Sequence, residues 1–127
     1  MSTLNVSNIT DGTDTVETGY VLNGSAKAWV SFQQDPSTSL INSLNISSQT
    51  DDATGRTTSN FSSSFTAATY CLTGQVFDGS AANDTRILNH DKGNDTYTAS
   101  AIKYYCWDGG SLNDAHRFFI ALHGDLA

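Results

Sequence analysis

The chain has 127 residues, of which 38% are hydrophobic and 15% are charged, and its formal net charge is −7 at pH 7. An acidic chain repels phosphate backbones, so this composition argues against nucleic-acid binding. No apolar run approaches the roughly 20 residues that a membrane-spanning helix needs, so we expect no membrane insertion. The 16 Ser and 16 Thr favour short strands joined by polar turns in one domain.

The first 25 residues carry little of the alternation that a core strand needs. Turn-forming residues at 11–14 and at 23–24 separate short apolar pieces. Such a segment is usually ordered by packing on something else. We predict an extended N-terminal arm over 1–25, for attachment or assembly, and a head domain over 26–127. The chain starts without a basic region followed by an apolar core, so we expect no signal peptide and assembly in a cytoplasm.

The first main strand is predicted over 26–33, where side chains alternate between two faces. One face is apolar and includes Ala28, Val30 and Phe32. Trp29 falls on the other, polar face. Because a ring of this size rarely stays exposed, either another layer of the chain or another copy covers it.

Six further strands follow, with turn signals about every 8–12 residues. They are predicted over 40–50, 57–65, 69–77, 85–90, 97–107 and 116–123. This spacing predicts an all-β fold, an antiparallel β-sandwich of about seven strands. Trp29, Trp107 and Phe119 exceed what a single two-sheet core of this size holds, so we predict that they lie at an oligomer interface.

The sequence contains no pattern that indicates catalysis. The three histidines have no identifiable nucleophile and acid around them, and no G-x-S-x-G motif is present. Cys71 and Cys106 are expected to be reduced thiols, with a disulfide as the alternative. We therefore predict a protein that is not an enzyme and has no cofactor.

Two weak metal-binding patterns in the sequence have simpler interpretations. Asp91, Asn94 and Asp95 place oxygen ligands in one turn, but they lack the spacing of the strong calcium motif. His123, near the end of the last strand, would meet its copies on a symmetry axis of an oligomer, but a polar residue at a strand end is the simpler explanation. We predict no metal site.

Alternation of strand direction predicts which loops share an end of the sandwich. If each consecutive pair is antiparallel, loops 34–39, 66–68 and 91–96 point away from the arm. Polar loops with one aromatic ring suit carbohydrate, through hydrogen bonds and ring stacking. We therefore expect a carbohydrate-binding surface in these loops.

Several segments resemble, in the same order, those of small tail-fibre-type proteins of tailed marine phages. Residues 26–32 read AKAWVSF beside that family's AKAWVNF. Residues 44–48 are similar to its FNVSSITDNGTG stretch, 67–72 to DANYAV and 120–125 to VAIFGD. The chain departs from the pattern in its Asp35-Pro36 loop and in the aromatic run 104–107.

The resemblance implies a non-enzymatic virion protein, assembled in the host cytoplasm as a homotrimeric tail fibre or fibre tip. Its expected partners are a host surface glycan or protein and, through residues 1–25, other virion proteins. The predicted receptor-binding residues in the loops described above are Gln34, Asp35, Asp91, Lys92, Asn94 and Tyr97. A head-decoration or adaptor protein without a receptor is the alternative of a different class. A polysaccharide-cleaving spike is a further alternative, but the resemblance supplies no catalytic residues.

Overall fold

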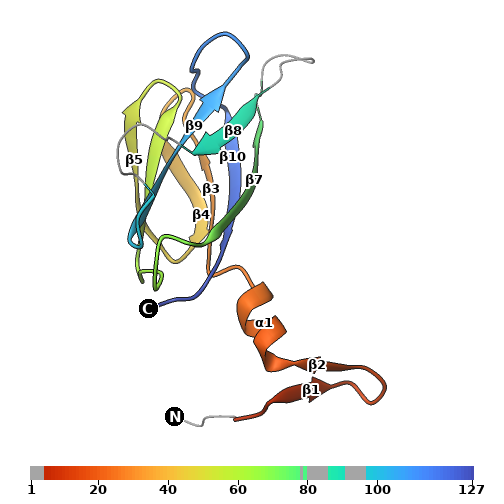
Figure 1. The fold of residues 1–127 in the computed structure, drawn as a ribbon. Helices are drawn as coiled ribbons and strands as arrows, with labels where there is room; N and C mark the ends of the chain where they lie inside the picture. Colours follow the sequence, from red (N-terminus) through yellow and green to blue (C-terminus); the bar gives the residue numbers. More distant parts are fainter. Residues whose placement is uncertain (1–4, 78, 80–85, 91–96) are drawn as a thin grey trace.

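The computed structural model describes residues 5–77, 79, 86–90 and 97–127. Two four-stranded antiparallel sheets pack face to face, which confirms the predicted β-sandwich (Figure 1). Sheet B has the order β4-β3-β10-β7, and its strands are Ser39–Leu44, Ala28–Gln33, Arg117–His123 and Cys71–Phe77. Sheet C has the order β5-β6-β9-β8, and its strands are Ile46–Ala53, Arg56–Phe61, Ala101–Trp107 and Ile87–His90.

The core lies between the inner faces of the two sheets. The predicted core face of the first strand is confirmed, since Ala28, Val30 and Phe32 are at most 3% exposed. The Phe32 ring stacks on Phe118 in sheet B with centroids 4.4 Å apart. It also meets Tyr104 of sheet C at 5.8 Å, so aromatic rings join the two layers.

The predicted strand over 40–50 is wrong, because the chain reverses at Asn45. Its φ of 57° lies in the left-handed region, which Asn tolerates better than most residues. The side chain fixes the reversal: Oδ1 accepts a hydrogen bond from the Ser63 amide at 2.7 Å, and Nδ2 donates to the Ser63 carbonyl at 3.0 Å. As a result β4 belongs to sheet B and β5 to sheet C.

This reversal changes which loops share an end, so the predicted loop grouping is also wrong. The loop after β3 lies beside the loop that precedes β10, because the Gln34 amide donates to the Ala115 carbonyl at 3.1 Å. We call this end the far end. At the opposite end Phe65 bridges to Leu126, and the Lys27 amide, just after the arm, donates to Leu122. We call this the arm end.

The arm projects from the arm end of the sandwich and has local structure of its own (Figure 1). Its elements are the hairpin of β1 (Asn8–Thr10) and β2 (Thr15–Glu17), followed by helix α1 (Thr18–Gly24). The Asp11 carboxylate accepts hydrogen bonds from the amides of Asp14 and Thr13, which lower its pKa. In the part of the chain that the structure describes, no helix is long and apolar enough to span a membrane.

Candidate functional site

Of the predicted receptor-binding residues that the structure describes, Gln34 and Asp35 lie at the far end and Tyr97 lies at the arm end. Gln34 is 2% exposed, and its amide nitrogen donates to the carbonyls of Ala53 and Arg56 at 3.2 and 3.3 Å. It therefore holds the β5–β6 hairpin instead of facing solvent. Asp35 is exposed at the far end.

Tyr97 lies at the arm end, where its hydroxyl donates to the Tyr70 carbonyl. The reversal at Asn45 explains this separation, since it inverts the predicted direction of the later strands and so places Tyr97, which precedes β9, at the arm end. The remaining predicted residues, Asp91, Lys92 and Asn94, lie outside the described residues.

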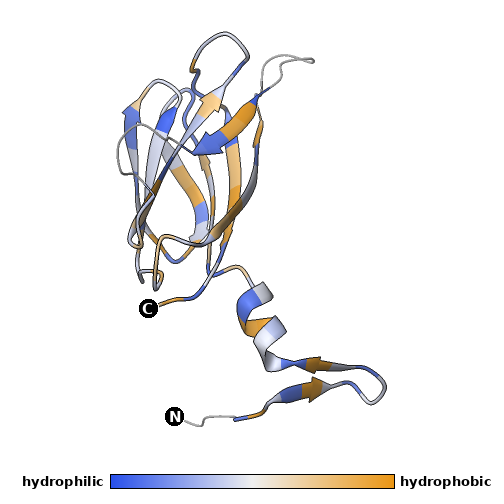
Figure 2. Cartoon of the chain, viewed as in Figure 1, coloured by the Kyte–Doolittle hydropathy of each residue, from blue (hydrophilic) through white to orange (hydrophobic). Residues whose placement is uncertain are grey.

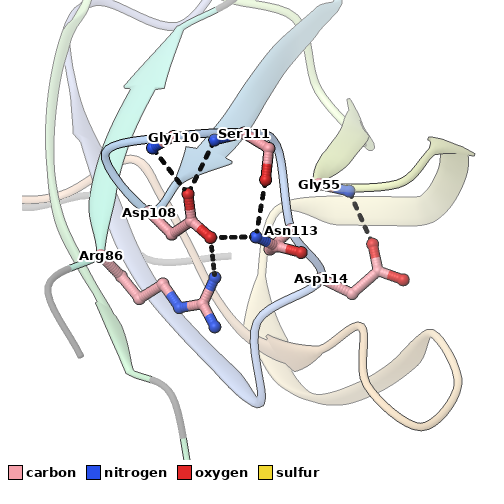
Figure 3. Close-up of polar contacts among 7 residues, drawn as sticks. All are labelled: Gly55, Arg86, Asp108, Gly110, Ser111, Asn113 and Asp114. Carbon is pink, nitrogen blue, oxygen red and sulfur yellow. Dashed lines mark hydrogen bonds and ion pairs between the residues drawn. The ribbon is translucent and has the colours of Figure 1, made fainter.

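A polar loop at the far end is built around Asp108 (Figure 3). Its Oδ1 accepts the amides of Ser111 at 2.8 Å and Gly110 at 2.9 Å, and Oδ2 accepts the Asn113 side-chain amide. Arg86 contributes an ion pair at 3.8 Å. The two backbone amides, more than Arg86, lower the pKa of the Asp108 carboxyl, so it stays ionised and orders the loop.

A second contact fastens this loop to the β5–β6 hairpin. The Gly55 amide donates to Asp114 Oδ1 at 2.6 Å, as Figure 3 shows. Gly55 has a φ of +66°, and a Cβ at this position would lie 2.7 Å from the Asn113 backbone nitrogen. Only glycine fits such a close approach without strain, so the far end is a fixed surface.

The outer face of sheet C carries a groove of about 290 Å³ lined by Ile87, Asn89, Tyr105 and Trp107, which we call the aromatic groove. Ile87 is paired with Trp107, and Asn89 with Tyr105. Because β9 ends at Trp107, the groove leads directly into the Asp108 loop at the far end. It therefore combines two aromatic side chains with an amide beside a fixed polar loop.

The outer face of sheet B carries apolar side chains with polar ones, Ser31, Thr73 and Gln75, between them. We call Trp29, Leu44, Phe77, Phe119 and Ala121 the apolar face. Trp29 is paired with Leu44 on one side and with Ala121 on the other. Phe119, Leu44 and Phe77 are 47%, 48% and 55% exposed. Trp29 and Phe119 also line a depression of about 410 Å³.

The predicted interface residues thus lie on two opposite surfaces. Trp29 and Phe119 share the apolar face of sheet B, whereas Trp107 lies on the outer face of sheet C in the aromatic groove. The sequence prediction missed Leu44 and Phe77 as further members of the apolar face. Side-chain alternation could have identified both residues, but the strands predicted over 40–50 and 69–77 were longer than the observed ones.

The cysteines and the buried Tyr104 have surroundings that are explained by the fold and do not indicate a reactive site. Cys71 is exposed and Cys106 is buried, and no disulfide bond joins them. Burial raises the pKa of Tyr104 to about 12, against hydrogen bonds from Ser59 and Gln49. Among the residues that the structure describes, no group of three His, Cys, Asp or Glu side chains is arranged to hold a metal ion.

Comparison of the chain with protein-family models, with curated proteins and with solved structures found no match.

Proposed function

We propose that this chain is a non-enzymatic virion structural protein, a phage tail-fibre or fibre-tip subunit that binds carbohydrate on the host surface. The resemblance to tail-fibre-type proteins supports the virion assignment. The observation that carries the binding role is the aromatic groove, which reaches the far end while the arm leaves the opposite end (Figure 1). One end then attaches the protein and the other meets the receptor.

The chemistry of the groove suits a sugar. A sugar ring has apolar C–H faces and a polar hydroxyl edge, so it matches a ring face with hydrogen-bonding groups beside it. Tyr105 and Trp107 supply the ring faces, and the Asn89 amide supplies both a donor and an acceptor. Such shallow sites bind weakly one at a time, and several linked copies raise the overall affinity.

Self-association is the second part of the proposal. Half-exposed aromatic and aliphatic side chains across one sheet are typical of the core of a protein interface. Contacts through Trp29 and Phe119 would leave the aromatic groove free, because that groove lies on the other sheet. A homotrimer that attaches to other virion proteins at its arm end and assembles in the host cytoplasm fits this arrangement.

The binding role is tested with purified protein on a glycan array, followed by calorimetric titration with the oligosaccharide that binds best. The Trp107→Ala and Tyr105→Ala variants are expected to lose at least about tenfold in affinity, because each removes a stacking ring. Thr50→Ala, on the same outer face but outside the groove, is the matched control. Unchanged sugar binding by both groove variants would contradict the assignment of the groove.

A head-decoration or adaptor protein without a receptor is the second candidate. The apolar face and the arm favour it equally, since both suit assembly contacts. Immunogold labelling of purified particles separates the two candidates: label at the fibre tip supports receptor binding, whereas label spread over the head supports decoration.

A further inference from the structure

The arm exposes apolar side chains that nothing in a single copy covers. Tyr20 and Leu22 of α1 are 72% and 62% exposed, and Ile9 and Val16 of the hairpin are 49% and 39% exposed. Figure 2 shows apolar residues on both strands of the hairpin and on α1. A water-exposed segment would carry polar side chains at these positions, so the arm has the composition of a contact surface.

The local structure of the arm also requires a partner. Its hairpin has two strands of three residues each, and an isolated two-stranded hairpin is marginally stable in water. Helix α1 has seven residues and no side-chain hydrogen bond at its N-cap, Glu17. Isolated helices this short do not persist without tertiary packing. The two elements support each other through Thr18, which donates to the Ser7 carbonyl, but both stay short and largely exposed, so packing on a further surface would stabilise them.

The arm does not reach the apolar face of its own copy. Residues 25–27 lead directly into β3, and the arm extends beyond the arm end of the sandwich (Figure 1). Near the junction the Gly24 carbonyl contacts His123 Nδ1 at 3.1 Å. The surfaces that each need cover thus lie apart within one chain.

The charges of the arm and of sheet B are complementary as well. Residues 5–24 contain Asp11, Asp14 and Glu17 and no basic residue. The four strands of sheet B contain no Asp or Glu, although the whole chain has a net charge of −7. Arg117 lies on the outer face of that sheet, paired with Phe77. An acidic, apolar arm therefore matches a weakly basic, apolar face.

We propose that the arm of one copy packs on the apolar face of a neighbouring copy, an inference that rests on the self-association in the proposed function. The occupant is a second copy of this chain, with Tyr20 and Leu22 set against Phe119, Trp29 and Leu44. Such a contact joins two different surfaces, and repeating it gives a ring when the rotation between copies closes; three copies form the smallest ring beyond a dimer.

The experiment mixes two full-length variants, each damaged on one side of the contact. The arm variant carries Tyr20→Asp and Leu22→Asp, and the face variant carries Leu44→Asp and Phe119→Asp. All four positions are at least 47% exposed, so each variant is expected to fold. A control with the same added charge carries Ser48→Asp and Thr50→Asp on exposed positions of sheet C. Circular dichroism and thermal unfolding check the fold of each variant, and analytical ultracentrifugation measures mass.

We expect each damaged variant alone to sediment as a monomer and the control to sediment as the wild type does. Mixing the two damaged variants is expected to restore a dimer, because the intact arm of one meets the intact face of the other. An arm variant that stays associated alone would indicate face-to-face contact, and a face variant that stays associated alone would indicate arm-to-arm contact. Either result, or a mixture that stays monomeric, would overturn this proposal, while the sugar titration tests receptor binding independently.

Discussion

Gly55 shows how one backbone position constrains the far end of the sandwich. Its positive φ makes the tight β5–β6 turn, and its missing side chain lets the Asn113 backbone approach. The carboxylate of Asp114 then receives the Gly55 amide. A side chain here would therefore disturb two loops at once.

We expect Gly55→Ala to destabilise the protein more than Gly109→Ala does. Both residues have a positive φ, which costs an L-residue about 1–2 kcal/mol. The added Cβ at Gly109 meets nothing within 4 Å, whereas at Gly55 it meets backbone atoms of Asn113 and Cys106 at 2.7–3.0 Å. Urea unfolding of both variants measures the difference. Equal losses would mean that the close approach of the two loops does not matter.

Asp108 gives the far-end loop a dependence on acid. Hydrogen bonds from the Ser111 and Gly110 amides lower the pKa of Asp108 in the folded protein. Their stabilising effect is therefore fully present at pH values above the ordinary carboxyl pKa of 3.8. It is lost as the pH falls through the lowered pKa. We expect the loop amides to lose hydrogen-exchange protection in that range before the core strands do.

The Asp108→Ala variant is the control for this acid effect. Its Ser111 and Gly110 amides lack the carboxylate acceptor at every pH, so they should exchange fast at neutral pH too. Protection that is the same in this variant and in the wild type would show that the carboxylate does not order the loop.

At the scale of the elements, alternation of side chains predicted the core strands well. The face that includes Val30 and Phe32 is buried as expected, because only one register puts these side chains between the sheets. The break within 40–50 depends on one Asn in a left-handed conformation, which leaves almost no sequence signal. The same break inverts the direction of the later strands, so the described residues of the loop-based receptor prediction, Gln34, Asp35 and Tyr97, lie at two ends of the sandwich.

The arm shows a second limit of sequence reasoning. The turn signal at 11–14 was visible and became the hairpin loop, but α1 contains Gly19 and ends at Gly24, which gives it a low helix propensity. Nothing in the local sequence predicts a helix there. The sequence indicates only part of the aromatic groove. The aromatic run 104–107 stands out as a departure from the tail-fibre-type pattern, but no pattern singles out Asn89.

The inner and outer faces of sheet B are expected to respond differently to the loss of a ring. Phe32→Ala removes a buried ring stacked on Phe118, so the free energy of unfolding should fall by about 3–5 kcal/mol. Phe119→Ala removes a ring that is 47% exposed, so in dilute solution it should change stability by about 0.5 kcal/mol or less.

Chemical unfolding and sedimentation of both variants separate these effects. Phe119→Ala should weaken association more than it weakens the fold, and Phe32→Ala should do the reverse. A large, concentration-independent loss of stability in Phe119→Ala would place that ring in the monomer core and remove it from the interface.

The whole molecule has two ends and two outer faces with different chemistry. The arm and the apolar face are suited to contact with other copies, and the aromatic groove and the Asp108 loop are suited to a polar ligand. Sheets B and C present these surfaces on opposite sides, so assembly and ligand binding do not compete for the same residues. This division is what a fibre subunit needs.

The proposed fibre role and the arm contact both require self-association. The mass of the full-length protein in solution tests this directly. Sedimentation equilibrium over a range of micromolar concentrations is expected to give about three times the chain mass of 13.6 kDa. A species that stays at 13.6 kDa at every concentration would contradict the account, because the apolar face and the arm would then both remain exposed to water.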